Sequence, residues 1–212
     1  MNSLSAVSAE ASEAYEASTE EICITHKSLA LAALCQRLYH DRKYHILDLG
    51  PALGANVEFF SQFRCKLYIE DFYKSVAEEL AAAEAETPSP EQLYQRLLPY
   101  AEDIRFDVIL CWDLFNYLPR RELQALLKHL ARFCQRGTLL FSLVTTHHQI
   151  PARPILFKIL DKENLIYETD SSDLRSSIEY KPRDLKLLMQ GFQIANNFQL
   201  RSGMQEFLFI HV

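Results

Sequence analysis

Residues 44–56 carry the most informative chemical pattern in the sequence, an acidic residue followed by small residues at alternate positions. An apolar run ends at Leu49, a short turn contains Gly50 and Gly54, and apolar residues then resume at helical spacing. The pattern predicts a strand, a tight loop and a helix. Because glycine has no Cβ, such a loop lets a ligand approach the backbone at the carboxyl end of a parallel strand. The chemistry expected here is therefore nucleotide binding.

The pattern D-x-G-x-A-x-G at residues 48–54 resembles the first motif of class I S-adenosylmethionine (SAM)-dependent methyltransferases. Ala52 stands where the family has its central glycine, and its methyl group narrows the space for the amino-acid end of SAM. The dinucleotide fingerprint G-x-G-x-x-G fits less well, because Ala52 and Ala55 hold two of its glycine positions. The motif therefore favours SAM over NAD. The resemblance implies cofactor contacts from Asp48, Gly50, Ala52, Gly54 and Asn56.

Two adjacent carboxylates, Glu70 and Asp71, follow the next short apolar segment at residues 65–69. In the family that the chain resembles, an acid at the end of this strand accepts hydrogen bonds from both ribose hydroxyls of SAM. A carboxylate suits this role because it has two acceptor oxygens and no donor. Asp71 lies 21 residues after Gly50 and matches the family's register, while Glu70 also fits the spacing. The alternative is a pair of solvated carboxylates at a strand end.

A second stretch that resembles the family covers residues 106–119, with a Phe-Asp entry, an apolar strand, a small loop and a Leu-Pro turn into a helix. The resemblance implies that Cys111 and Trp112 end this strand at the edge of the cofactor site. It also implies that Tyr117 touches SAM or the methyl acceptor. For Trp112, the alternative is a core aromatic residue whose N–H finds a single partner.

His147 and His148 follow another apolar strand, at residues 138–144. Substrates bind at the carboxyl ends of such strands, and imidazole can accept a proton near neutral pH. No further His, Cys or acidic residue stands at ligand spacing, so the pair predicts no metal site. The candidate catalytic residues are therefore His147, His148 and Tyr117. Methyl transfer is an in-line displacement that chiefly needs alignment, so a catalytic base is not obligatory.

The segments around these motifs predict one domain with two additions. Residues 1–12 are rich in Ser, Ala and Glu and predict a disordered tail. Residues 13–40 repeat apolar side chains at helical spacing and predict an N-terminal helical cap, which lies either over the cofactor mouth or against the sheet. Residues 149–181 form a long insertion that predicts a lid over the active site, with a structural flap or a subunit contact as alternatives.

The resemblance implies an α/β fold for residues 13–212, a Rossmann-like seven-stranded sheet that is mostly parallel, with an antiparallel last strand and helices on both faces. The family's third strand is hard to locate, because only residues 101–104 stand before the strand that begins at Phe106. Leucines at spacings of three and four predict a long amphipathic helix over residues 120–136, stopped by Gly137.

The composition restricts the class of protein. The 212 residues are 49% hydrophobic, enough for one substantial core. A net charge of -6 argues against nucleic-acid partners and anionic membranes, which need clustered Lys and Arg. The five cysteines are scattered and odd in number, which favours buried thiols in the cytoplasm over a disulfide framework. Neither a membrane span nor a signal peptide is expected.

The sequence thus predicts a cytoplasmic enzyme that transfers a methyl group from SAM to a small-molecule acceptor. A homodimer is left open. The alternative from another class is a non-catalytic module that binds SAM or a protein partner. It would have kept the sheet while Ala52 and the missing third-strand acid eroded the pocket.

Overall fold

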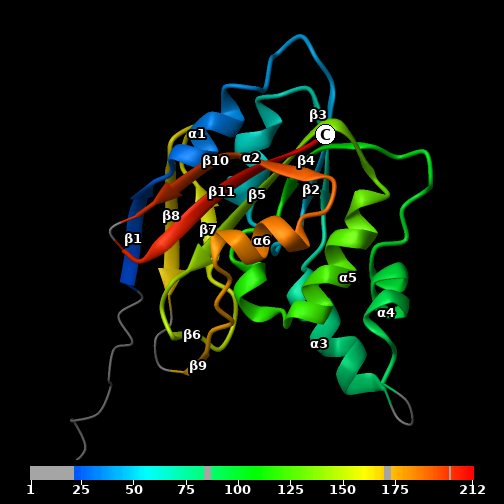
Figure 1. Ribbon diagram of the computed structural model, residues 1–212. Coiled ribbons are helices and arrows are strands. Elements are labelled where there is room, and N and C mark those ends of the chain that lie inside the picture. Colours follow the sequence, from blue (N-terminus) through cyan, green and yellow to red (C-terminus); the bar gives the residue numbers. More distant parts are fainter. Residues whose placement is uncertain (1–21, 84–86, 170–172, 201) are drawn as a thin grey trace, which may run out of the picture.

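A six-stranded sheet with the order β10-β11-β5-β4-β2-β3 lies at the centre of the computed structural model, which describes residues 22–83, 87–169, 173–200 and 202–212 (Figure 1). Neighbouring strands from β3 to β5 pair in parallel, while β11 is antiparallel to both β5 and β10. The predicted antiparallel last strand is therefore confirmed. The strands of this sheet are β2 (Tyr44–Asp48), β3 (Cys65–Ile69), β4 (Phe106–Leu110), β5 (Cys134–Thr145), β10 (Phe192–Gln199) and β11 (Met204–His211).

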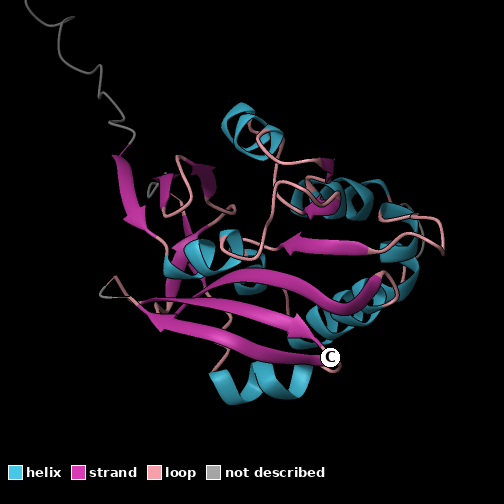
Figure 2. Cartoon of the chain, turned by 90° about the horizontal axis from the view of Figure 1, so that it is seen from above, coloured by secondary structure: helices cyan, strands magenta, loops and turns pink. Residues whose placement is uncertain are grey.

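Helices cover both faces of the sheet, and Figure 2 shows the strands lying between them. One face packs against α3, α4, α5 and α6 in a single apolar cluster, and the other packs against α1 and α2. Because both faces are covered, the central strands are apolar on both sides: Leu47 and Ile109 are fully buried on one side, Ile46 and Leu110 on the other. The helices are α1 (Leu29–Cys35), α2 (Gly54–Ser61), α3 (Phe72–Ala82), α4 (Pro90–Leu97), the 3₁₀ turn η1 (Leu114–Tyr117), α5 (Arg120–Ala131) and α6 (Pro182–Leu188).

A second, smaller sheet lies on the α1 and α2 side of the molecule (Figure 1). It contains β1 (Ile22–Lys27), β8 (Asn164–Thr169) and β7 (Leu156–Ile159), all antiparallel. Two short strands, β6 (Gln149–Pro151) and β9 (Leu174–Ser176), pair beside it. The described residues of the predicted insertion at 149–181 thus form four strands, and β1, from the N-terminal side of the chain, completes the sheet of β7 and β8.

The predicted count of seven strands is wrong for the described residues, which place six in the central sheet. Between β3 and β4 the described chain forms α3 and α4, and residues 101–104 lie in a turn. The start of α4 is strongly encoded, because Ser89 and Gln92 make a capping box around Pro90. The only segment left for the family's third strand, residues 101–104, therefore forms no strand.

The N-terminal helical cap is only partly correct. Residues 22–27 form β1 instead of a helix, whereas residues 29–35 form α1, which packs on the central sheet. The β-branched residues Ile22, Ile24 and Thr25 favour an extended chain, and pairing with β8 supplies its hydrogen bonds. Residues 1–21, which include the predicted tail, lie outside the described part of the chain.

Helix α5 ends at Ala131, earlier than the predicted Arg136, because β5 already begins at Cys134. Gly137, the predicted stop, lies inside β5 with a φ of 93°. Among the described residues, no helix is long and apolar enough to cross a bilayer.

Candidate active site

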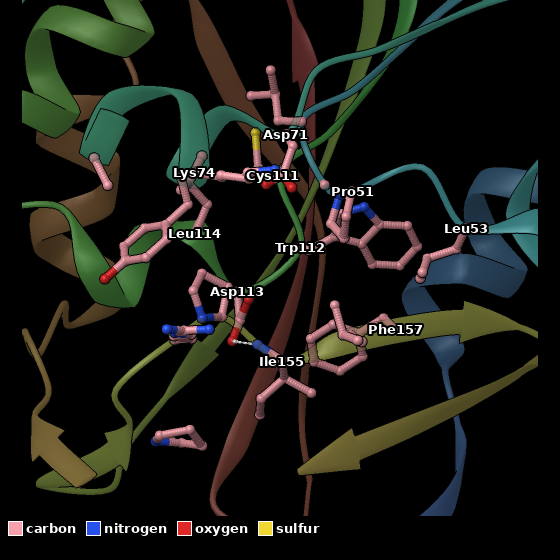
Figure 3. Close-up of a pocket in the computed structure, with 18 of the residues that line it drawn as sticks. Pro51, Leu53, Asp71, Lys74, Cys111, Trp112, Asp113, Leu114, Ile155 and Phe157 are labelled. Atoms are coloured by element: carbon pink, nitrogen blue, oxygen red, sulfur yellow. Dashed lines mark hydrogen bonds between the residues drawn. The ribbon is translucent and has the colours of Figure 1, made fainter. Parts of the chain in front are cut away.

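A cavity of about 1020 Å³ opens at the carboxyl ends of β2 and β4, between α3 and residues 151–157 of the insertion (Figure 3). The loop after β2 contributes Gly50 to its wall, and the end of β4 contributes the segment 111–114. One face of α3 closes a further side, because residues that recur at helical spacing reach the cavity. These α3 residues are Tyr73, Lys74, Ala77, Glu78 and Ala81.

Gly50 is covered by the indole of Trp112. A Cβ at Gly50 would lie 2.8 Å from Trp112 Cδ1, so only glycine leaves room for the ring. Trp112 Nε1 donates to Asp48 Oδ1 at 2.6 Å, and the Gly50 amide donates to the same oxygen at 2.9 Å. The space expected for a ligand over Gly50 is thus taken by a side chain of the protein itself.

Trp112 holds this position through an unusual backbone conformation, with a φ of 48°. Its carbonyl oxygen accepts hydrogen bonds from the Leu143 amide at 2.6 Å and the Ser142 hydroxyl at 3.1 Å, both from β5. The indole stacks on Phe157 of β7, with ring centroids 5.8 Å apart and planes 6° from parallel (Figure 3). Trp112 therefore connects the first loop, the sheet and the insertion.

Asn56, expected to contact the cofactor, also lines the cavity but has its side-chain amide bound to the insertion. Its Nδ2 donates to the Phe157 carbonyl at 3.0 Å, and its Oδ1 accepts from the Ile159 amide at 2.8 Å. Asn56 thus continues the hydrogen bonding of β7 onto α2. Its first role in the fold is to hold the insertion against the cofactor loop.

The two carboxylates after β3 have different environments. Asp71 lines the cavity, and although it is the N-cap residue of α3 its side chain makes no capping hydrogen bond. Glu70 is outside the cavity wall and accepts a hydrogen bond from the Tyr100 hydroxyl at 2.9 Å. The carboxylate of Asp71 therefore remains available to a ligand, while that of Glu70 serves the fold.

Asp113 is a cavity residue that the sequence analysis did not select. Its side chain is buried, its Oδ2 accepts from the Ile155 amide at 3.1 Å, and no described residue donates to its Oδ1 (Figure 3). Burial raises the pKa of Asp113 to about 7. Only its place directly after an apolar strand, next to Trp112, could have indicated it.

The remaining predicted residues divide into those on the cavity and those away from it. Cys111 lines the cavity, and burial raises the pKa of its thiol well above the ordinary value, so it is not a thiolate. Ala52 and Gly54 are exposed and absent from the wall, so the Ala52 methyl group does not narrow the cavity.

The three candidate catalytic residues also lie outside the cavity wall. His147 Nε2 is 2.6 Å from the Ser202 carbonyl oxygen, and His148 is exposed and pairs with Glu179. Tyr117 is buried and donates to the Arg153 carbonyl at 2.8 Å. The ends of β4 and β5 are neighbours in the sheet, but these three side chains bind partners outside the cavity wall or, for Tyr117, a backbone carbonyl of the insertion.

The buried carboxylates predict a specific dependence of stability on pH. The folded protein holds protons on Asp113, with a pKa of about 7, that the unfolded chain releases near pH 4. The contribution of protonated Asp113 to the free energy of unfolding is therefore full below pH 4 and is lost as the pH rises to about 7. Asp113→Asn should abolish this loss, so between pH 4 and pH 8 its free energy of unfolding should fall by on the order of 4 kcal/mol less than that of the parent.

Urea unfolding from pH 4 to pH 8 measures this effect. Asp173→Asn, which alters an exposed carboxylate on the same cavity, is the matched control and should keep the parent's pH slope. Burial raises the pKa of Asp48 to about 6, so both variants should retain part of the dependence of unfolding free energy on pH. Identical slopes in Asp113→Asn and the parent would contradict the prediction.

The model of the methyltransferase domain family matches residues 24–196. None of the curated proteins matches the chain. Among solved structures, PH0226 from Pyrococcus horikoshii OT3 has a TM-score of 0.52 at 14% identity, with 86% of this chain and 88% of that chain covered. A SAM-dependent methyltransferase from Clostridium acetobutylicum ATCC 824 has a TM-score of 0.48 at 11% identity, with 84% and 87% covered.

The likeness to PH0226 supports the fold described above, at an identity too low to carry function. The family match is independent of it and extends from β1 into β10, across every loop that lines the cavity. The chain therefore belongs to the methyltransferase domain family, whose cofactor is SAM.

Proposed function

We propose that the chain transfers a methyl group from SAM to a small-molecule acceptor within the cavity between α3 and residues 151–157. One observation carries the proposal: Asp71, whose carboxylate makes no capping hydrogen bond to α3, shares a cavity with Gly50 and the end of β4. This supports Asp71 as the acceptor of the ribose hydroxyl groups, because the cavity lies where parallel sheets bind nucleotides.

The residues on the cavity fit SAM. Its volume of about 1020 Å³ is at the upper end of the range for small-molecule sites. Its wall carries an available carboxylate at Asp71 and a buried carboxylate oxygen without a donor at Asp113, and SAM brings hydroxyl groups and positive charge. The surface of Gly50 is the exception, because the Trp112 indole occupies it.

SAM, when bound, supplies a methyl group on an electrophilic sulfonium. The residues of the chain would orient the acceptor and keep water away, because an in-line displacement depends on alignment. Ile155 and Phe157 of the insertion give the cavity an apolar wall suited to excluding water. Tyr117 remains a candidate near the acceptor through its neighbour Asp113, whereas the positions of His147 and His148 give no support to a catalytic role.

We assign the choice of acceptor to the lid, defined as residues 149–181. Its segment 151–157 lines the cavity, and the hydrogen bonds of Asn56 hold this segment in place. A covered cavity suits a small acceptor better than a polymer, and the net charge of -6 disfavours nucleic acid. The cysteine usage suggests the cytoplasm as its location.

One observation favours the second candidate function, a non-catalytic module that binds SAM or a partner. The Trp112 indole covers Gly50 and engages Asp48, so the first loop is filled by the protein itself. In this alternative, SAM binds weakly or only after the ring moves. Measured binding of SAM without turnover on a broad panel of small acceptors would support it.

Calorimetric titration with SAM tests the proposed site. Asp71→Ala should weaken SAM binding by about 1 to 3 kcal/mol, because two ribose hydroxyl groups lose their acceptor. Glu70→Ala is the matched control: it removes a neighbouring carboxylate that is bound to Tyr100, and it should leave SAM affinity nearly unchanged. Equal losses in the two variants, or a larger loss at Glu70, would overturn the assignment of Asp71.

A further inference from the structure

Asp113 presents an unpaired carboxylate oxygen inside the cavity. The residue is 3% exposed and lies three residues after the end of β4. One oxygen is fixed by the lid, since the Ile155 amide donates to Oδ2 at 3.1 Å, and the other has no donor among the described residues (Figure 3). A buried carboxylate in this state is costly unless a proton or a cation reaches it.

The neighbouring side chains do not supply that cation. Tyr117, from η1, lies beside Asp113, but its hydroxyl proton is donated to the Arg153 carbonyl. Tyr73 of α3 packs edge-on against Tyr117, and the Arg175 guanidinium from β9 lies over the Tyr117 ring, 5.8 Å from its centroid. In the described parts of the chain, no Lys, Arg or His forms an ion pair with Asp113.

The charges on the cavity wall also favour a cationic ligand. Carboxylates come from the N-cap and body of α3, the β4 loop and the lid, whereas Lys74 and Arg153 are the Lys and Arg residues on the described wall. Three of the carboxylates can reach solvent, but Asp113 cannot. The carboxylates are Asp71, Glu78, Asp113 and Asp173.

We infer that Asp113 Oδ1 binds a cationic group of SAM and acts as its counter-ion in the cavity. This inference rests on the proposed function. SAM carries two cations, its sulfonium and its α-ammonium, and either would compensate the buried carboxylate. Asp113 is thus a specificity residue, which favours ligands that carry this cation over relatives that lack it.

Binding of three adenosine ligands at pH 8 distinguishes the two cations. SAM carries both charges, S-adenosylhomocysteine lacks the sulfonium, and 5′-methylthioadenosine lacks both. Asp113→Asn keeps the shape of the side chain and an acceptor for the Ile155 amide. If Asp113 binds the sulfonium, this variant should lose about 10- to 100-fold in affinity for SAM alone. If it binds the α-ammonium, SAM and S-adenosylhomocysteine should lose affinity alike, and 5′-methylthioadenosine should lose none.

Proton release offers a second measurement that needs no variant. Near pH 7 roughly half of the free protein molecules hold a proton on Asp113, because the pKa of this carboxyl group is about 7. A bound cation lowers that pKa, so SAM binding should release protons to the buffer, while 5′-methylthioadenosine should release none from this group. Calorimetry in buffers of different ionisation enthalpy measures the release.

The outcomes separate this inference from the proposed site. Asp71→Ala should weaken all three ligands, because each carries the ribose. If the unmodified protein binds none of the three, the proposed function fails. If all three bind, but Asp113→Asn affects them equally or not at all and SAM releases no protons, only the role of Asp113 is overturned.

Discussion

Glu206→Ala should lower the free energy of unfolding by about 3 to 5 kcal/mol, the cost of breaking a buried pair at one partner. Glu206 lies on β11 with 0% of its surface exposed. Its Oε1 is 2.7 Å from His26 Nε2, and its Oε2 accepts from the Ala30 amide at 2.9 Å. Without the carboxylate, a histidine of β1 and a backbone amide in the first turn of α1 lose their acceptor.

The adjacent ion pair provides the control. Lys27 and Glu163 are 3.1 Å apart, and both side chains are more than half exposed. Glu163→Ala should therefore cost less than about 1 kcal/mol, and Glu206→Gln should fall between the two because it retains an acceptor oxygen. Urea unfolding of the full chain gives all three values. Similar losses in Glu206→Ala and Glu163→Ala would show that the buried carboxylate does not anchor β1.

The destabilisation caused by Glu206→Ala should extend to the lid, because β1 pairs with β8 along its whole length. Hydrogen exchange of β8 should accelerate in Glu206→Ala more than exchange of β4, which lies inside the central sheet. The contacts of Glu206 thus link the central sheet, through β1, to the lid of the proposed site.

Trp112→Ala should also cost about 3 to 5 kcal/mol, because it removes a buried indole from between Gly50 and Phe157. Trp112→Phe should cost less, since it retains a ring but loses the donor to Asp48. A double-mutant cycle with Phe157→Ala should give a coupling of about 0.5 to 1.5 kcal/mol for the stacked pair. Purely additive losses would contradict a direct contribution from the stack.

Ligand binding by the same variant tests whether the indole competes with SAM. Because the ring covers Gly50, we expect its removal to strengthen SAM binding, measured by calorimetry on Trp112→Ala below its unfolding temperature. Weaker binding than in the unmodified protein would mean that the indole forms part of the SAM site. Phe157→Ala, which removes the stacking partner but leaves Trp112 in the sequence, is the control for a loosened lid.

The sequence was sufficient for the parallel core because its signals are local. Apolar runs at β2 and β4, followed by turn residues, predicted strands whose carboxyl ends share one edge of a sheet. That edge accounts for the correct placement of Gly50, Asp71 and Cys111 on one cavity. Their roles with SAM remain predictions.

Elements formed by distant pairing were not predictable in this way. Strand β1 exists because residues 22–27 meet β8, more than a hundred residues later, and the helical spacing nearby was misleading. The seventh strand was predicted from the family resemblance alone, because residues 101–104 carry no strand signal of their own and lie in a turn.

Within the site, the sequence by itself determined which backbone segments meet, and the tertiary structure decided what their side chains do. The Trp112 indole covers Gly50, the Asn56 side chain is hydrogen-bonded to β7, and Asp113 Oδ1 has no hydrogen-bond partner among the described residues. Each outcome depends on partners distant in the chain and on a backbone conformation that β5 stabilises. Strand periodicity fixes where a residue lies, but a side-chain direction is fixed only when packing and hydrogen bonds from several elements select one rotamer.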